Sequence, residues 1–227
     1  MSANRIVENR NLTRADIAQL AADGGPLQVH NCKLDGVDFG DAELMEWTFE
    51  KCELRAARLD QCILDEVTFK GCRAVDTTFR SVRCDQVTFE NCDLSNASFI
   101  HAKLADVAFK SCKMLGTDFS SVTFADVSFD ESNLGLSQLR GLAMAKATLK
   151  AVNFDQADLS ESTFKDAVLD ECSLRDTIVS DANFQGADLR SCDLGGLQMS
   201  DARRFKGAII SKRQAADLLG QLGLKVI

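Results

Sequence analysis

A repeat of five residues governs most of this sequence. Every fifth residue from Leu34 to Met199 is apolar, and 28 of these 34 positions hold Leu or Phe. The remaining six are also non-polar, namely Ala74, Cys84, Met114, Met144, Val179 and Met199. A second column, two residues before the first, holds small or β-branched residues nearly throughout and never a charged one. Each unit therefore has two apolar positions and three that are mostly polar.

A period of five matches neither the 3.6-residue period of an α-helix nor the two-residue period of a strand. A short repeat that persists over residues 32–201 is typical of a solenoid, in which each unit buries its apolar side against the next. If one unit forms one side of a four-sided coil, two residues of every five point inward and three point outward. The sequence shows this division between apolar and polar positions.

Typical units read A-D-L-S-E at residues 157–161, A-N-F-Q-G at residues 182–186 and C-D-L-S-N at residues 92–96. They resemble the pentapeptide-repeat superfamily, whose fold is a right-handed quadrilateral β-helix with four units per coil. The resemblance implies an all-β solenoid of about eight coils over residues 32–201. We expect a short helical N-terminal cap at residues 1–31, and a C-terminal capping and dimerisation helix with a tail at residues 202–227.

Both ends carry helix signals. Thr13 and Asp16 have the spacing of a capping box, and the glycines and proline at 24–26 would end a helix, so we expect one over residues 11–22. The alternative takes residues 10–17 as two repeats in a shifted frame. At the other end, Ser211-Lys-Arg-Gln214 is a second capping box, which predicts a helix to about Leu222.

The nine cysteines do not predict disulfides or a metal site. Stacked strands lie ~4.8 Å apart, which exceeds the ~3.8 Å between Cβ atoms in a disulfide, and a linear column cannot surround a metal tetrahedrally. We therefore expect reduced, buried thiols, no metal and no cofactor. Seven cysteines share one position of the coil, namely Cys32, Cys52, Cys72, Cys92, Cys112, Cys172 and Cys192.

The sequence contains none of the patterns that would predict an enzyme. His30 and His101 lie too far apart to cooperate, and there is no phosphate loop, H-E-x-x-H or C-x-x-C motif. The carboxylates fall on flat faces and not in a dry concave site, so a small-molecule substrate is not expected either. Without basic patches and interleaved aromatic residues, direct nucleic-acid binding is not expected. No membrane span or signal-peptide core is found, so we expect a cytoplasmic protein.

The formal net charge of −8 conceals an acidic repeat region and a basic end. Residues 32–201 sum to −13, whereas residues 202–227 carry +5. We number the faces of the coil by the apolar residue that each holds first, with Leu34 on face one, Phe39 on face two, Leu44 on face three and Phe49 on face four. Faces two and three hold the acids that few bases can pair with, so we expect a partner to bind Asp38, Asp41, Glu43, Glu46, Asp60, Asp65, Glu66, Asp85, Asp106, Asp118, Asp126, Asp158, Glu161, Asp166 and Asp181.

Within the superfamily, the chain looks like the gyrase-protecting group that confers resistance to quinolones or toxins. The acidic faces carry this resemblance, together with the ending Q-A-x-x-L-L-x-x-L-G at residues 214–223. It implies that the rod mimics DNA and occupies the DNA-binding saddle of a type II topoisomerase, either DNA gyrase or topoisomerase IV. It also implies a homodimer formed through the C-terminal end, with contacts at Leu218, Leu219, Leu222, Leu224, Val226 and Ile227.

Other functions are compatible with the same residues. Outward-facing apolar residues suggest a scaffold, such as an adaptor, chaperone or immunity partner of a secreted effector; they are Val75, Ile100, Leu115 and Leu136. A scaffold contact should be insensitive to salt, whereas a DNA mimic should bind its partner more weakly as salt rises. A third alternative is a housekeeping repeat protein, whose acidic faces only keep it soluble. The sequence does not identify the partner, nor whether gyrase would be protected, inhibited or left unbound.

Overall fold

The computed structural model describes residues 5–221 and 223–226. The chain forms two compact units, unit 1 ending at Asn133 and unit 2 beginning at Leu134. Unit 1 contains β1 (Arg5–Glu8), α1 (Arg14–Ala22), β2 (Leu27–His30), β3 (Glu43–Met45), β4 (Trp47–Glu50), β5 (Ile63–Asp65), β6 (Thr68–Lys70), β7 (Arg83–Glu90), β8 (Lys103–Lys110) and β9 (Thr123–Asp130). Unit 2 contains β10 (Thr148–Lys150), β11 (Val168–Asp170), the 3-10 helix η1 (Met199–Phe205) and α2 (Lys212–Gly220).

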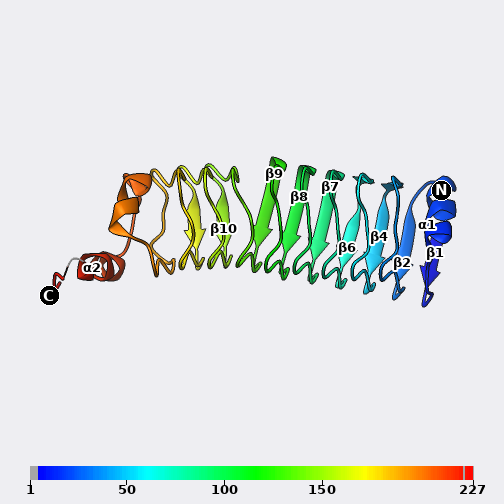
Figure 1. The fold of residues 1–227 in the computed structure, drawn as a ribbon, viewed down its shortest axis with the longest axis horizontal. Helices are drawn as coiled ribbons and strands as arrows, with labels where there is room; N and C mark the ends of the chain where they lie inside the picture. The colour runs from blue at the N-terminus through cyan, green and yellow to red at the C-terminus, as the bar shows by residue number, and fades with distance from the viewer. Residues whose placement is uncertain (1–4, 222, 227) are drawn as a thin grey trace. The chain divides into compact units, whose positions relative to one another are not determined.

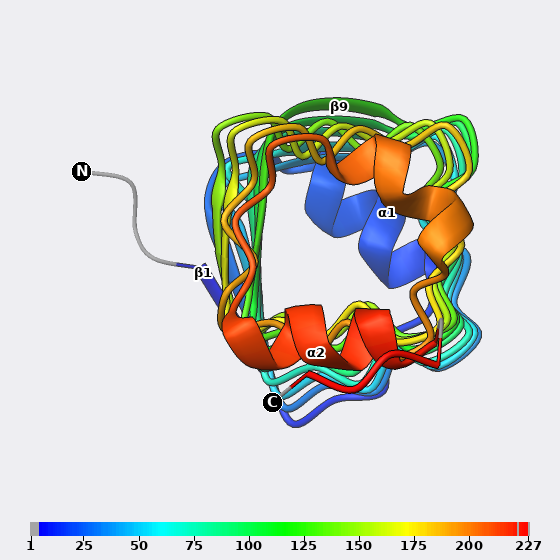
Figure 2. The ribbon, with the colours of Figure 1, turned by 90° about the vertical axis from the view of Figure 1, so that its left-hand side faces the viewer.

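Parallel strands in unit 1 repeat at intervals of 20 residues, and this confirms the expected β-solenoid. Phe49 of β4 pairs with Phe69 of β6, which pairs with Phe89 of β7, and β8 and β9 continue the series. Isolated bridges such as Asp38 with Arg58 keep the same register on another side of the coil. The strands of the unit therefore stack side by side (Figure 1), and each coil has four sides when it is seen end-on (Figure 2).

The core of each coil consists of the two apolar columns that the sequence predicts. The register places identical residues on top of one another, so the rings of Phe89 and Phe109 stack with centroids 5.0 Å apart. A second aromatic column stacks in the same way, with 5.0 Å between Phe99 and Phe119. The two columns meet edge to face, as Phe99 and Phe109 do at 5.9 Å and 88°. Offset stacks and edge-to-face contacts are both favourable aromatic geometries.

All nine cysteines are free, buried thiols, and all except Cys84 lie in the small-residue column. Each thiol in this column donates a weak hydrogen bond to a carbonyl of the preceding coil, as Cys72 Sγ does to Phe49 O at 3.3 Å. Ser132 occupies the same kind of position and bonds to Phe109 O at 3.4 Å. Burial also raises the pKa of the Cys62 thiol to about 12, so this side chain stays protonated and unreactive.

The N-terminal segment combines the two alternatives left open by the sequence. The capping box between Thr13 and Asp16 is present, but α1 begins at Arg14 and not at residue 11. The residues before it extend along the first coil, with Leu12 N donating to Lys33 O at 2.9 Å. The first strand, β1, pairs with β2, and β2 pairs with β4 in the regular 20-residue register. Residues 27–30 therefore belong to the solenoid and not to the expected cap.

The last coil of unit 2 contains one additional residue. Asp188 pairs with Ile209, an offset of 21, and Phe205 stacks on Phe184 with centroids 4.6 Å apart. The 3-10 helix η1 lies in this segment and accommodates the additional residue. The repeat therefore continues beyond residue 201 in a shifted frame, with Phe205 in the core column. The sequence signal that was missed is the five-residue interval between Phe205 and Ile210.

Candidate partner-binding surface

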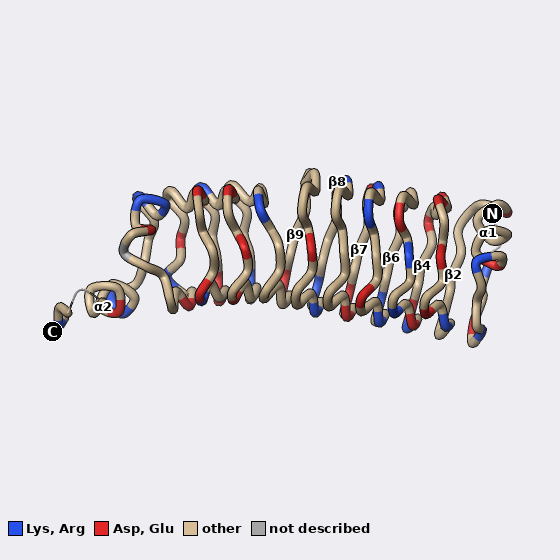
Figure 3. Tube along the Cα trace, viewed as in Figure 1, with Lys and Arg blue, Asp and Glu red and all other residues tan. Residues whose placement is uncertain are grey.

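Seven acids on the third side of the coil form the largest group of unpaired carboxylates in unit 1. We call them the acidic face; they are Glu43, Glu46, Asp65, Glu66, Asp85, Asp106 and Asp126. Within the described part of the chain, none of these carboxylates forms a hydrogen bond or an ion pair. Within unit 1, only Arg83 and Lys103 carry positive charge on this side, so the net charge of face three in unit 1 is −5. Figure 3 shows acidic positions recurring from coil to coil in this unit.

The backbone places four of these acids at the edge between two sides of the coil. Glu46, Glu66, Asp106 and Asp126 have φ values of 58°, 53°, 50° and 53°. Left-handed backbone is uncommon for residues other than glycine, and here it turns the chain at each corner. The side chains at these corners therefore form a column that follows the stacking direction. The other three acids lie on β3, β5 and β7, next to that column.

The charge density of the acidic face can be compared with that of DNA. Five coils at ~4.8 Å per coil extend over ~24 Å, so a net charge of −5 corresponds to one negative charge per ~5 Å. B-DNA carries one per ~1.7 Å of helix axis. This single side of the coil therefore has about a third of the charge density of duplex DNA. That density attracts a basic groove without reproducing the DNA surface.

A shallow hollow of about 360 Å³ lies on the same side of unit 1. Its lining includes the outward-facing residues Ala105 and Ala125, whose side chains are too small to fill the surface. Two acids, Asp65 and Asp85, and two bases, Arg83 and Lys103, lie around them. The surface is therefore recessed next to the column of corner acids, and the charges around the hollow itself balance.

The acids of face two have a different environment, because several already have partners. Asp38 forms ion pairs with Arg14 at 2.7 Å and Arg58 at 2.6 Å. It also accepts a hydrogen bond from Gly40 N at 2.9 Å. The Gly40 amide, followed by the Arg58 guanidinium, lowers the pKa of the Asp38 carboxyl. A carboxylate held in this way stabilises the first coil and is less available to a partner.

Most of the other acids on face two also make local contacts. Asp118 and Asp158 accept hydrogen bonds from backbone amides two residues ahead, at 2.8 and 2.9 Å. Asp60 accepts one from Arg80 N at 2.8 Å, and Glu161 pairs with Arg140 at 2.5 Å. The fifteen predicted acids thus fall into three groups. Seven form the acidic face, four lie on face two of unit 1 (Asp38, Asp41, Asp60 and Asp118), and four belong to unit 2 (Asp158, Glu161, Asp166 and Asp181).

Two of the predicted dimerisation residues line an apolar hollow at the C-terminal end of unit 2. This hollow measures about 330 Å³, and Leu218 and Leu219 of α2 line it together with Leu197 and Phe205. Two residues of the tail, Leu224 and Val226, are each 55% exposed. The remaining two predicted contacts, Leu222 and Ile227, lie outside the described residues.

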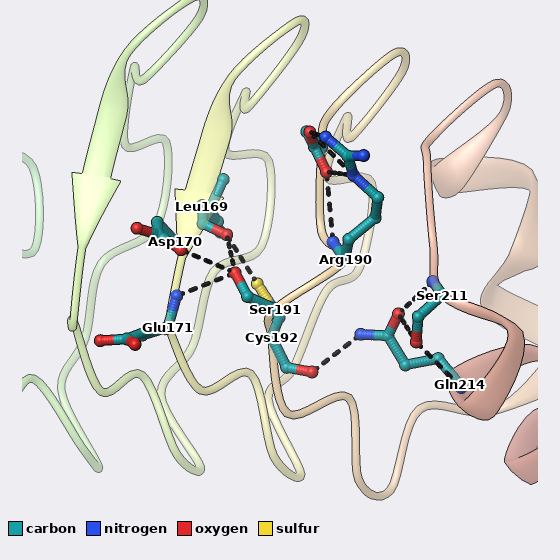
Figure 4. Close-up of polar contacts among 9 residues, drawn as sticks. Leu169, Asp170, Glu171, Arg190, Ser191, Cys192, Ser211 and Gln214 are labelled. Atoms are coloured by element: carbon teal, nitrogen blue, oxygen red, sulfur yellow. Dashed lines mark hydrogen bonds and ion pairs between the residues drawn. The ribbon is translucent and has the colours of Figure 1, made fainter.

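A buried glutamine attaches α2 to the last coil (Figure 4). Gln214 Nε2 donates to Leu189 O and Cys192 O, each at 2.8 Å, and Gln214 Oε1 accepts from Ser211 N at 2.6 Å. Leu189 O also accepts from Cys192 N at 3.0 Å, whereas Cys192 O lies at a position whose carbonyl elsewhere accepts an amide of the next coil, as Cys172 O does from Asp193 N. The Gln214 side chain therefore takes the place of the next coil at Cys192 O.

The apolar residues that suggested a scaffold do not form one patch in unit 1. Val75 and Leu115 share a column, but they are two coils apart with Ser95 between them. Ile100 is half-buried on the neighbouring side, and Leu136 belongs to unit 2. In unit 1, Leu115 is therefore an isolated exposed side chain.

The described part of the chain contains no cluster of metal-ligating side chains and no membrane-spanning helix. No group of three or more His, Cys, Asp or Glu side chains in this part of the chain is arranged to hold a metal ion. Neither of its helices, nor any other described segment, forms a helix long and apolar enough to cross a membrane.

Comparisons with known proteins identify the repeat. The family model described as pentapeptide repeat region matches residues 62–139 and 82–159, and the model described as pentapeptide repeats (8 copies) matches residues 144–181 and 167–203. No curated protein sequence matches the chain.

Solved structures show the same fold at low sequence identity. Full-length QnrB1, a plasmid-mediated fluoroquinolone resistance protein, is 20% identical with a TM-score of 0.64, and the match covers 97% of this chain and 98% of that chain. HetL, a pentapeptide repeat protein involved in heterocyst differentiation regulation from the cyanobacterium Nostoc sp. strain PCC 7120, is 17% identical with a TM-score of 0.57. That match covers 82% of this chain and 86% of HetL.

Proposed function

This chain belongs to the pentapeptide-repeat family, and on that basis we propose that it is a non-enzymatic binding protein that acts as a DNA mimic. Its partner in this proposal is a type II topoisomerase, DNA gyrase or topoisomerase IV. The acidic face of unit 1 contacts the positively charged surface on which the topoisomerase normally holds DNA. By occupying that surface, the protein modulates the topoisomerase or protects it from inhibitors.

The unpaired state of the acidic face is the observation that carries this proposal. Its seven carboxylates have no hydrogen bond or ion pair in the described part of the chain. A partner that brings Lys and Arg side chains to this surface would not have to break existing ion pairs. Asp38 is different, because its pairs with Arg14 and Arg58 would have to be broken before it could bind a partner. The binding surface we propose is therefore narrower than the two sides predicted from the sequence.

Similarity to QnrB1 supports the choice of a topoisomerase among basic DNA-binding partners. QnrB1 is a fluoroquinolone resistance protein, and its fold matches 97% of this chain. At 20% identity the match concerns the fold, and the unpaired carboxylates of the acidic face support the choice of a basic DNA-binding partner. We place the protein in the cytoplasm, where it can meet such a partner.

The proposal includes a homodimer formed through the C-terminal end. The hollow lined by Leu218 and Leu219 is apolar, and Leu224 and Val226 leave apolar surface exposed. Burial of such surface against a second copy is favourable, at about 25 cal/mol per Å² of apolar area. Leu222 and Ile227 belong to the same proposed contact. Sedimentation of a Leu224→Asp/Val226→Asp variant tests it, since the proposal predicts a monomer.

DNA supercoiling by purified gyrase tests the main proposal. The reaction is run with and without a quinolone, across a titration of this protein, at about 50 and 200 mM salt. We expect a dose-dependent rescue or inhibition that weakens at the higher salt concentration, because salt screens contacts between exposed charges. Supercoiling that is unchanged at a large protein excess would refute the proposal. In that case, an affinity search with Leu115→Lys as control would test the scaffold alternative.

A charge-reversed variant locates the contact. Lys51 and Lys146 already occupy corners with φ of 55° and 61°, so the double variant Asp106→Lys/Asp126→Lys is compatible with the backbone. We expect it to raise the concentration needed for the gyrase effect about tenfold or more, since like charges oppose docking. The matched control is Asp76→Lys, at a corner of another side with φ of 57°. An equal loss in both variants would contradict a contact at the acidic face.

A further inference from the structure

A polar hollow of about 600 Å³ lies at the last coil of unit 2. Unlike the acidic face of unit 1, it is surrounded mainly by basic and hydrogen-bonding side chains. Ala182 is its only apolar lining residue among those described. The polar lining consists of Asp181, Asn183, Gln185, Ser200, Arg203, Arg204 and Lys206.

The additional residue in the last coil brings three cations to this place. Phe184 N donates to Arg204 O at 2.8 Å, and Gly186 N donates to Lys206 O at 3.3 Å. The segment from η1 to Lys206 is therefore held against residues 184–186 by the backbone. Because the neighbouring Phe205 is stacked on Phe184 in the core, this position is determined by the packing of the coil and not by an isolated loop.

The positive charge of the hollow is only partly neutralised. Arg203 and Lys206 form no ion pair or side-chain hydrogen bond with any residue that the structure describes. Arg204 pairs with Asp201 through Nη1 at 2.7 Å, but its Nε is shielded from solvent and has no acceptor among the described residues. Asp181 is the one carboxylate in the lining. The three cations are therefore opposed by two carboxylates, Asp181 in the lining and Asp201 on Arg204.

The neutral lining residues supply further donors. Asn183 Oδ1 accepts a hydrogen bond from Gln185 N at 2.9 Å, which leaves the Asn183 amide nitrogen as a donor. Ser200 contributes a hydroxyl group, and Gln185 contributes a second amide. Guanidinium groups form paired hydrogen bonds with phosphate oxygens, and an ammonium group acts as a point charge. This set of side chains suits an anion with several oxygen atoms.

We propose that this hollow is a binding site for a phosphate group, either free or carried by a nucleic-acid strand. Asp181 and the Asp201 partner of Arg204 together balance two of the three cations, so the hollow keeps a net positive charge. The donors of Arg203 and Lys206 and the buried Arg204 Nε, which have no partner among the described residues, suit the several free oxygens of a phosphate group. The site lies in unit 2, so it is independent of the acidic face and of the topoisomerase proposal.

Calorimetric titration of the full chain with inorganic phosphate at pH 7.5 and low ionic strength tests the site. A parallel titration with a short fluorescent single-stranded DNA distinguishes the two sources of phosphate. We expect Lys206→Glu and Arg203→Glu each to weaken binding about tenfold or more, since a charge-assisted hydrogen bond is lost and a repulsive charge is added. The matched control is Lys212→Glu at the exposed first residue of α2, which should bind as the wild type does.

A gain of affinity provides a second test that does not depend on damaging the site. Asp181 has a φ of 56°, and asparagine adopts this conformation readily, so Asp181→Asn should fold normally. Removal of the opposing charge should tighten phosphate binding about threefold at low salt. Binding of phosphate alone, or of DNA alone, with these variant effects supports the site and identifies its source of phosphate. No binding of either ligand, or equal binding by Lys206→Glu and Lys212→Glu, would overturn the proposal.

Discussion

Replacement of Gln214 by leucine should release α2 from the last coil. Gln214 is 4% exposed, and its amide nitrogen donates to two carbonyls, Leu189 O and Cys192 O, at 2.8 Å each. Leucine has a similar size but no donor, so Cys192 O would lose its partner, whereas Leu189 O would keep the hydrogen bond from Cys192 N at 3.0 Å. A buried acceptor without a partner costs about 1–3 kcal/mol. Leucine also removes the bond from Ser211 N to Gln214 Oε1.

The loss should be seen as local opening of the C-terminal end. We take about 2 kcal/mol for the unpartnered Cys192 carbonyl and about 1 kcal/mol for the lost bond from Ser211 N, and so expect about 3 kcal/mol in total. That free energy corresponds to roughly hundredfold faster opening-limited exchange of the α2 amides, at 1.4 kcal/mol per factor of ten. Hydrogen exchange measured by mass spectrometry over residues 215–219 provides the assay.

The control substitutes a second glutamine of the same end. Gln221 donates one exposed hydrogen bond to Leu197 O at 2.7 Å, so Gln221→Leu should change exchange by less than about tenfold. If the α2 amides exchange as slowly in Gln214→Leu as in Gln221→Leu, the buried glutamine does not hold the helix.

Replacement of Gln214 by glutamate adds a pH test. The new carboxyl group would face two carbonyl oxygens, which disfavour its ionised form. Its folded-state pKa is therefore raised, and the destabilisation should grow as pH rises above about 4.

Three further predictions concern the solenoid itself. Phe109→Ala should lower the free energy of unfolding by about 3–5 kcal/mol in urea titrations, because the Phe109 ring is fully buried and stacks on Phe89 at 5.0 Å; a loss below about 1 kcal/mol would contradict this packing. Cys62, whose pKa is raised to about 12 by burial, should resist a thiol reagent at pH 8 until urea unfolds the chain; rapid labelling of the native protein would show that the column is accessible. Asp38→Asn should reduce the difference in stability between pH 7 and pH 3, because the lowered folded-state pKa of Asp38 contributes stability above about pH 4 that is lost on acidification; an unchanged difference would show that its contacts with Gly40 and Arg58 do not contribute.

Local sequence signals predicted several elements correctly, because the interactions behind them span only a few residues. Both capping boxes are present, at Thr13 with Asp16 and at Ser211 with Gln214. The inward columns were also predictable, since a constant five-residue interval leaves only one way to bury all the Leu and Phe side chains. The additional residue before Phe205 was not predicted, because a strict count of every fifth residue fails after one inserted residue. The packing of the coil tolerates the insertion, since Phe205 still stacks on Phe184.

The acids of the repeat differ from one another in ways that the sequence does not predict. Asp38 and Asp106 have the same charge and lie on neighbouring sides of the coil in unit 1. Asp38 has two arginine partners, one of them Arg14, which α1 brings to the first coil. Asp106 has no partner among the described residues. No spacing rule predicts this difference, because a pair between residues 14 and 38 depends on where the N-terminal helix packs.

The sequence by itself determined the family, the register of the coils and the residues of the core, because each depends on a repeat that is continuous along the chain. Only the tertiary structure decided which carboxylates remain without partners, how Gln214 closes the last coil, and where Arg203 and Lys206 meet a polar hollow. These features depend on contacts between segments about 20 or more residues apart and on the two ends, where the repeat is broken. The proposed binding surfaces are defined by such contacts, so the repeat alone could indicate their charge but not their extent.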